Sequence, residues 1–200
     1  MNGAVVPVLT AESAEDAERA CRAILAGGLT SVEITFRAGP TVEAIRRASQ
    51  LEGLSVGAGT VLSETQLLAA AAAGAQFAVA PSTNEAVIQA AQRAGIPFVP
   101  GAATPSEIDR ARTLGCRIVK IFPASLLGGP AFIRSMAPLF PDLEFVPTGG
   151  INASNLADYL ALSSVRACGG TWICEPELLR QGRFEEIERR SRDAARLVTA

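Results

Sequence analysis

Lysine occurs only once in this sequence, at position 120, whereas the other seventeen of its eighteen basic residues are arginines. Arginine replaces lysine wherever a positive charge is enough, but it does not supply a neutral amine. Lys120 lies in an apolar segment, RIVKIFP at 117–123. Burial among apolar side chains favours the neutral amine, which attacks carbonyl carbons to form a Schiff base. Lys120 is therefore a candidate nucleophile, and the alternatives are a lysine that snorkels to solvent or a structural partner for Glu33.

Three polar side chains share one face of a second apolar segment, VEITFR at 32–37. Because side chains alternate between the two faces of a strand, Glu33, Thr35 and Arg37 point to the same side. The opposite face is apolar and would pack on helices, so the polar face would point inward. Interior charge is costly unless it is used or paired. We expect a functional role for this set, with a structural Glu33–Arg37 ion pair as the alternative.

These segments belong to a regular alternation of short apolar runs and longer amphipathic stretches. Ser13 and Ser63 are typical helix N-caps, and Gly74, Gly95 and Gly115 each end a helix just before an apolar run. Such an alternation predicts an α/β fold with a parallel sheet. Eight units favour a single-domain (β/α)8 TIM barrel over residues 1–200 rather than an open sheet, since no GxGxxG follows the first strand. Strands are predicted at 5–9, 31–36, 54–58, 76–79, 97–99, 117–122, 144–147 and 165–168, with one or two closing helices from 175.

The active site of such a barrel lies at the C-terminal ends of its strands, where this chain places glycines and threonines. The third strand runs into Gly57-Ala58-Gly59-Thr60, and the last two end in Thr148-Gly149-Gly150 and Gly169-Gly170-Thr171. Exposed backbone N–H groups in these last two loops, with the N-terminus of a short extra helix, commonly hold phosphate. Glu175-Pro176-Glu177 is a candidate start for that helix. The loops predict a site for phosphate or another anion, with ordinary tight turns as the alternative.

Composition argues against several other classes of protein. The net charge is −2 and the acidic and basic residues are interspersed, which argues against nucleic-acid or anionic-membrane partners. The chain has no histidine, and none of its four cysteines forms a CxxC pair, so we expect no metal site and buried free thiols. The apolar run at 4–9 is too short to span a bilayer, and no secretory signal precedes it. We expect a cytoplasmic protein.

Eight motifs, in this order, carry a resemblance to a known family. They are VVPV at 5–8, EITFR at 33–37, VGAGTVL at 56–62, GAQFA at 74–78, IPFVPG at 96–101, KIFPA at 120–124, PTGGI at 147–151 and GGTW at 169–172. The chain resembles, over nearly its whole length, the 2-keto-3-deoxy-6-phosphogluconate (KDPG) / 4-hydroxy-2-oxoglutarate (KHG) aldolases. These are class I aldolases with a barrel fold.

The resemblance implies a reaction and a role for each matching residue. It implies cleavage of KDPG to pyruvate and glyceraldehyde 3-phosphate, or of KHG to pyruvate and glyoxylate, in a homotrimer that needs no metal or cofactor. KDPG cleavage is a step of the Entner–Doudoroff pathway. Lys120 would form the Schiff base and Glu33 would be the acid–base residue. Arg37 and Thr60 would hold the substrate carboxylate. The other implied substrate-binding residues are Phe122, Pro81, Thr148, Gly149, Gly150, Gly170 and Thr171.

Some residues depart from the family pattern and bear on substrate preference. Thr171 stands where serine is common, Ser82 where glycine is usual, and Ser125-Leu126-Leu127 replaces a more polar segment. The first strand also begins almost at once, without the usual lead-in helix, which would leave the bottom of the barrel less covered.

Three alternatives to this function stay open at this point. The first is a phosphate-binding isomerase or epimerase, in which Glu33 is the base and Lys120 only an electrostatic clamp. The second is an aldolase for 2-keto-3-deoxy-6-phosphogalactonate, which Arg37 mildly disfavours. The third is a ligand-binding barrel without turnover, against which the Glu33, Arg37 and Lys120 set argues.

Overall fold

A computed structural model of the chain describes residues 4–199, and its strands and helices alternate as the sequence predicts. All strand pairs between these elements are parallel. The strands are β1 (Ala4–Leu9), β2 (Ser31–Thr35), β3 (Ser55–Gly59), β4 (Phe77–Val79), β5 (Phe98–Val99), β6 (Gly101–Ala102), β7 (Ile118–Ile121), β8 (Glu144–Pro147) and β9 (Ala167–Gly170).

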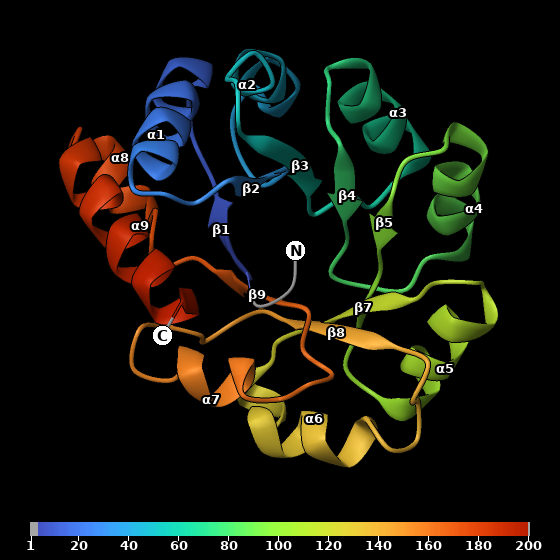
Figure 1. The fold of residues 1–200 in the computed structure, drawn as a ribbon. Helices are drawn as coiled ribbons and strands as arrows, with labels where there is room; N and C mark the ends of the chain where they lie inside the picture. Colours follow the sequence, from blue (N-terminus) through green and yellow to red (C-terminus); the bar gives the residue numbers. More distant parts are fainter. Residues whose placement is uncertain (1–3, 200) are drawn as a thin grey trace.

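The helices lie around the outside of the strands, so each strand has one face toward a helix and one toward the middle of the molecule (Figure 1). Side chains on both faces are therefore buried along most strands, as in β2 and β9, where every residue is buried. The helical segments are α1 (Ala14–Ala26), α2 (Thr41–Ala48), α3 (Glu64–Ala72), α4 (Glu85–Ala94), α5 (Pro105–Thr113), the 3-10 turn η1 (Ser125–Leu127), α6 (Pro130–Met136), α7 (Leu156–Leu160), α8 (Pro176–Arg180) and α9 (Phe184–Thr199).

The strands form a curled parallel sheet in two parts. A six-stranded part has the order β5-β4-β3-β2-β1-β9, and a three-stranded part has the order β6-β7-β8. On one side, only Pro100 separates β5 from β6 in the chain. On the other side, single bridges pair Phe145 with Val165 and Thr148 with Gly169. The parallel α/β architecture predicted from the sequence is confirmed, and the strand ends that carry the candidate residues lie along one edge of the sheet.

Local sequence signals set the helix boundaries as predicted at several positions. The side chains of Ser13 and Ser63 accept hydrogen bonds from the backbone N–H groups of Asp16 and Gln66. Gly95 ends α4 in the left-handed region at φ 66°, where a side chain would be strained. These caps fix where each helix begins and ends, and therefore where the following strand enters the sheet.

Other boundaries differ from the predicted ones, for identifiable reasons. The predicted fifth strand, 97–99, is observed at Phe98–Val99, and a further short strand, Gly101–Ala102, follows Pro100, which lacks the N–H that continuous pairing needs. The last strand runs from Ala167 to Gly170 rather than over 165–168, so Gly169 and Gly170 lie within it. Helix α6 begins at Pro130, because proline is well suited to a first helical position.

The apolar core has two parts on opposite faces of the sheet. Most buried side chains pack between the strands and the helices, with Leu9, Ile34 and Ile121 essentially inaccessible. A smaller cluster on the inner face comprises Val6, Phe77, Val79 and Ala167, with Val99 packed against it. The inner face thus combines this apolar cluster with the polar residues of β2 and β7.

All four cysteines are buried free thiols, as predicted. Burial raises the pKa of Cys21 and of Cys168 to about 12, and it also raises the pKa values of Cys116 and Cys174. Since the thiolate is the reactive form, these cysteines have little nucleophilic character in the folded protein.

We therefore predict that iodoacetamide at about pH 8 leaves Cys21, Cys168 and Cys174 unmodified in the folded protein, because burial suppresses their thiolates. Cys116, which retains 8% of its exposed surface, should react first. Mass spectrometry after timed labelling measures this, with the denatured chain, in which all four react, as the control. Labelling of Cys174 at the same rate in folded and denatured protein would contradict the prediction.

Candidate active site

The centre of the site is an ion pair between β7 and β2 on the inner face of the sheet. Lys120 Nζ donates to Glu33 Oε1 at 3.2 Å and lies 3.4 Å from Glu33 Oε2. The two side chains are only 4% and 5% exposed. Glu33 pairs with Lys120 and not with Arg37, so the alternative of a Glu33–Arg37 ion pair is wrong.

Glycines on neighbouring strands make room for this pair. Gly59 of β3 lies beside Glu33, and a Cβ there would clash with the Glu33 carboxylate. Gly101 is the register partner of Lys120 on β6, and a Cβ there would clash with the backbone of Pro81. Gly59 thus leaves room for the Glu33 carboxylate, whereas Gly101 leaves room for the backbone of Pro81. This brings Pro81, a predicted substrate-binding residue, close to the strand beside Lys120.

The pair combines an amine and a carboxylate that can act together on a carbonyl group. In a low-dielectric interior, the two charges are strongly coupled, and neither is easily replaced by solvent. Transfer of one proton from Lys120 to Glu33 leaves a neutral amine and a neutral acid without moving net charge. The Phe122 ring centroid lies 5.7 Å from Lys120 Nζ, so an aromatic face borders the amine as predicted. A neutral amine next to an acid can add to a carbonyl and protonate the oxygen.

Arg37 and Thr60 lie together at the C-terminal ends of β2 and β3. Arg37 Nε donates to Thr60 Oγ1 at 3.2 Å, and Arg37 is exposed in the turn after β2, whereas Glu33 within β2 is buried. Thr60 has φ 58°, a left-handed conformation that is unusual for a β-branched residue. Strained backbone of this kind tends to persist at functional sites. The guanidinium and the hydroxyl together offer donors for a carboxylate.

Sequence reasoning missed a second polar contact on this inner face. Thr10 Oγ1 and Thr35 Oγ1 lie 2.7 Å apart, and the Thr41 hydroxyl donates to the Thr35 carbonyl oxygen at 3.0 Å. Thr35 was expected to share a face with Glu33, but its partner Thr10 was not singled out. Thr10 directly follows β1. Because active-site residues of such folds lie at the C-terminal strand ends, its position could have marked it as a candidate.

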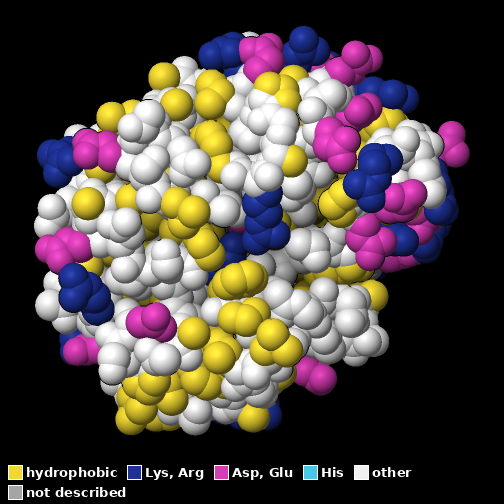
Figure 2. All heavy atoms as spheres, turned by 180° about the vertical axis from the view of Figure 1, so that it is seen from behind, with side chains coloured by type: hydrophobic (Ala, Val, Ile, Leu, Met, Phe, Trp, Pro, Cys, Tyr) yellow, Lys and Arg dark blue, Asp and Glu magenta, His cyan; other side chains and the backbone are white. Residues whose placement is uncertain are grey.

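The two glycine loops lie side by side because Thr148 of one bridges to Gly169 of the other. Gly149 and Gly150 have φ values of 98° and 74°, which only glycine adopts readily. Gly150 abuts the Ser125 side chain, where a Cβ would clash. Figure 2 shows a hollow near the middle of the face opposite to that seen in Figure 1, with basic and hydrophobic side chains at its rim.

Two other residues predicted to hold an anion, Gly170 and Thr171, lie at the end of β9, and helix α8 follows them. Thr171 is exposed just after β9, and the Trp172 ring lies against Gly170, where a Cβ would clash with it. The short helix α8 begins at Pro176, as expected. Its last turn is tied to the loop after β1 by an Arg180–Glu12 ion pair at 3.4 Å. Whether α8 contacts a bound anion stays a prediction.

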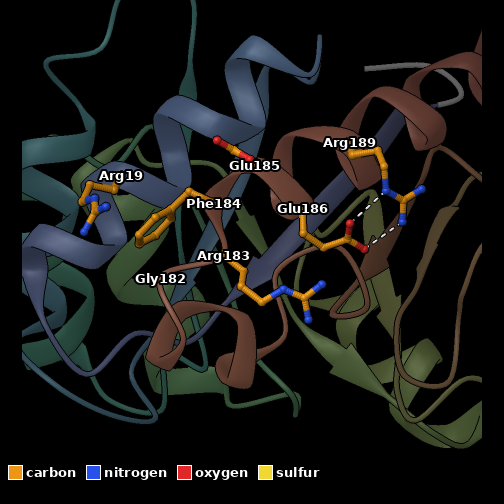
Figure 3. A pocket seen from close by; sticks show the side chains of 7 residues that line it. All are labelled: Arg19, Gly182, Arg183, Phe184, Glu185, Glu186 and Arg189. Carbon is orange, nitrogen blue, oxygen red and sulfur yellow. Dashed lines mark hydrogen bonds and ion pairs between the residues drawn. The ribbon is translucent and has the colours of Figure 1, made fainter.

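A pocket of about 650 Å³ lies away from these residues, at the start of α9 beside α1 (Figure 3). Its charged side chains mostly form ion pairs with one another, and one of them, Arg19, stacks on an aromatic ring. Arg19 lies over the Phe184 ring at 4.1 Å, and hydrogen bonds from Arg189 and Arg190 lower the pKa of Glu186 to about 2. The pocket contains neither Lys120 nor Glu33, so it is not part of the candidate site.

Residues 4–199 contain neither a metal-binding cluster nor a helix that could span a membrane. No group of three or more histidine, cysteine, aspartate or glutamate side chains there is arranged to hold a metal ion. Within the same range, no helix is both long and apolar enough to cross a bilayer.

Comparison with known proteins gives the family. Residues 1–190 match the model of the KDPG and KHG aldolase family. A 2-dehydro-3-deoxy-phosphogluconate aldolase of Treponema pallidum is 42% identical over 195 residues, which cover 97% of this chain and 93% of that protein.

Two solved structures agree. One is a KDPG aldolase from Legionella pneumophila with pyruvate captured at low pH as a covalent carbinolamine intermediate (TM-score 0.90, 33% identity, 95% of this chain and 93% of that one). The other is the KDPG aldolase of Zymomonas mobilis with 3-phosphoglycerate (TM-score 0.88, 33% identity, 95% and 90%). The chain therefore belongs to the family of KDPG and KHG aldolases, which are lyases.

Proposed function

We propose that this protein is a class I aldolase that cleaves a 2-keto acid through a Schiff base on Lys120. The observation that carries the proposal is the buried ion pair, with Lys120 Nζ 3.2 Å from Glu33 Oε1. An amine in that setting gains or loses a proton at short range without help from solvent. The carbinolamine described for the Legionella relative is the product of amine addition to a ketone, which supports the same first step here.

The proposed sequence of steps assigns Lys120 and Glu33 complementary roles. Neutral Lys120 attacks the C2 ketone, and Glu33 delivers a proton to the departing hydroxyl, so that water leaves and a protonated imine forms. Glu33, directly or through a water, then accepts the C4 hydroxyl proton. The C3–C4 bond breaks, its electrons move into the imine, and an aldehyde and an enamine result. Protonation of the enamine at C3 and hydrolysis release pyruvate and free Lys120.

The two ends of the substrate would be held by different groups. Arg37 and Thr60, already 3.2 Å apart, would bind the carboxylate beside the ketone. The aldehyde-derived end would lie along Phe122, Pro81 and Thr148. A terminal phosphate would then meet backbone N–H groups and one hydroxyl, those of Gly149, Gly150, Gly170 and Thr171.

The phosphate loops favour KDPG, cleaved to pyruvate and glyceraldehyde 3-phosphate, over KHG, cleaved to pyruvate and glyoxylate. The 3-phosphoglycerate in the Zymomonas relative is, like KDPG, a phosphorylated carboxylate, and this supports the preference. A KDPG substrate places the reaction in the Entner–Doudoroff pathway. The 4-epimeric phosphogalactonate substrate is the alternative within the same mechanism, since neither end of the site addresses C4.

We also propose that residues 1–200 form one domain, in which the sheet closes into a (β/α)8 barrel. The Phe145–Val165 and Thr148–Gly169 bridges support closure between β8 and β9, and the short gap at Pro100 supports continuity between β5 and β6. A homotrimer in the cytoplasm, with no cofactor, completes the proposal. Leu126 and Leu139 are 86% and 62% exposed, which suits burial in a subunit interface, and free thiols suit a reducing compartment.

The Lys120→Arg variant tests the proposal and separates it from an electrostatic clamp. Arginine keeps the positive charge opposite Glu33 but offers no neutral amine. We predict that kcat for KDPG cleavage falls by at least about 10⁴-fold, because the covalent route is lost. A coupled assay that detects pyruvate measures this.

Lys120→Met, of similar length but uncharged, is the matched control for the loss of charge, and the thermal unfolding of both variants reports whether they fold. A folded Lys120→Arg protein that cleaves KDPG at near the original rate would contradict the covalent mechanism. It would favour the clamp role expected of an isomerase-type site.

The phosphate assignment predicts a substrate-selective effect of Thr171→Val. Valine keeps the branched shape but removes the hydroxyl, so one hydrogen bond to a charged phosphate is lost. This corresponds to a rise of about 10–100-fold in KM for KDPG. KHG lacks the phosphate, and its kcat/KM should change less than about twofold. Equal losses for both substrates, measured side by side, would show that Thr171 does not act on phosphate.

A further inference from the structure

The inner face of the sheet lines a small apolar cavity between the Lys120–Glu33 pair and the N-terminal strand ends. Its volume is about 100 Å³. Strand side chains that point inward form most of its wall, namely Val6, Phe77, Val79, Val99, Ile118 and Val146. The cavity is therefore a gap in the interior layers that commonly fill a strand barrel.

Strand register places this cavity below the reacting groups. Ile118 is two residues before Lys120 on β7 and faces the same side. At the other end of the wall, Arg166 immediately precedes β9, where Ala167 is level with Ala4 at the start of β1. Glu33 is level with Val8, near the end of β1, and borders the cavity from that side. The cavity thus runs between Arg166 at the N-terminal strand ends and Glu33.

The apolar wall is incompletely covered by the described residues. Val99, Ile118 and Val146 are only partly buried although they point inward. In a tightly filled interior, such side chains would be inaccessible. A closed apolar space of about 150 Å³ binds a guest the size of benzene. This cavity is smaller but open beside these three side chains, so a single small ring can occupy it in part.

Arg166, which lines the cavity, carries a buried side-chain donor without an acceptor among residues 4–199. Its Nη1 donates to Glu144 Oε2 at 2.7 Å, so its charge already has a counter-charge. Its Nε is buried, and no atom of residues 4–199 accepts a hydrogen bond from it. A buried donor without an acceptor costs free energy, and an acceptor brought by a ligand would remove that cost.

We propose that this cavity is a binding site for a compact, neutral, mostly apolar molecule that carries one hydrogen-bond acceptor oxygen. The apolar body fills the space between Val79, Val99 and Val146, and the oxygen accepts from Arg166 Nε. A carboxylate fits less well, because Glu144 already neutralises Arg166 and Glu33 borders the other end. The site does not depend on the proposed reaction.

The test compares two ring compounds of nearly the same shape, tetrahydropyran and cyclohexane. Only tetrahydropyran has an acceptor oxygen, and neither has a carbonyl that reacts with Lys120. Each is titrated into the full-length protein with labelled valine and leucine methyl groups, and the methyl NMR shifts are followed. We expect saturable shifts at Val79, Val99 and Val146 but not at Leu62 or Leu126, and a Kd about tenfold lower for tetrahydropyran.

Two variants locate the interaction. Arg166→Met removes the donor and should bring the two Kd values within about twofold of each other. Val99→Phe fills the space and should abolish the shifts for both compounds. If the larger residue prevents folding, Val99→Leu, which adds one methylene, should weaken binding of both compounds.

Three results would overturn the proposal: no saturable shifts, a preference for tetrahydropyran that survives in Arg166→Met, or shifts confined to the active-site face. Cavity contacts made instead by Met1–Gly3, seen as methyl contacts to those residues, would also overturn it.

Discussion

The contact between Lys120 and Glu33 is the constraint on which the rest of the site depends. Two opposite charges are held at 3.2 Å with almost no exposure to solvent. Removing charges from water costs several kcal/mol per ion, and only close pairing offsets it, so the pair contributes little to stability. Loss of one partner alone would cost about 3–5 kcal/mol, because the other would be left buried and unpaired. Because the pair adds so little to the free energy of unfolding, a role in catalysis explains its presence better than a role in stability.

The neighbouring strands serve this contact in distinct ways. Gly59 of β3 leaves space for the Glu33 carboxylate, and Gly101 of β6, level with Lys120, lets the backbone of Pro81 approach. Arg37 and Thr60 add donors at the strand ends above the pair. Toward the N-terminal strand ends, the cavity beside the pair is lined by apolar side chains, with Arg166 and Glu33 at its two ends. From the C-terminal to the N-terminal strand ends, the inner face thus presents the Arg37 and Thr60 donors, then the Lys120–Glu33 ion pair, then apolar side chains.

Much of this could be predicted from the sequence where a local rule decides the outcome. Strand alternation placed Glu33 and Lys120 on the inner face, and side-chain caps placed the starts of α1 and α3. The sequence offered both Lys120 and Arg37 as partners of Glu33 and could not decide between them. The choice depends on how two strands 87 residues apart are brought together.

The same limit applies to the Thr10–Thr35 contact and to the cavity beside Arg166, since both depend on how distant strands pack. The division of the fifth strand at Pro100 has a visible cause in the sequence, but its effect on sheet pairing appears only in three dimensions. The roles of Arg37, Thr60 and the glycine loops toward a substrate stay predictions, because they concern contacts with a molecule that the chain alone does not contain.

The most direct measurement is reduction of the protein with borohydride in the presence of pyruvate, followed by proteolysis and mass spectrometry. A Schiff base on Lys120 predicts that the peptide containing Lys120 gains the mass of one pyruvate less one oxygen atom. Because the chain has a single lysine, the only other amine is at its N-terminus, and that peptide serves as the internal control. An unmodified Lys120 peptide, or an adduct found only at the N-terminus, would contradict the account.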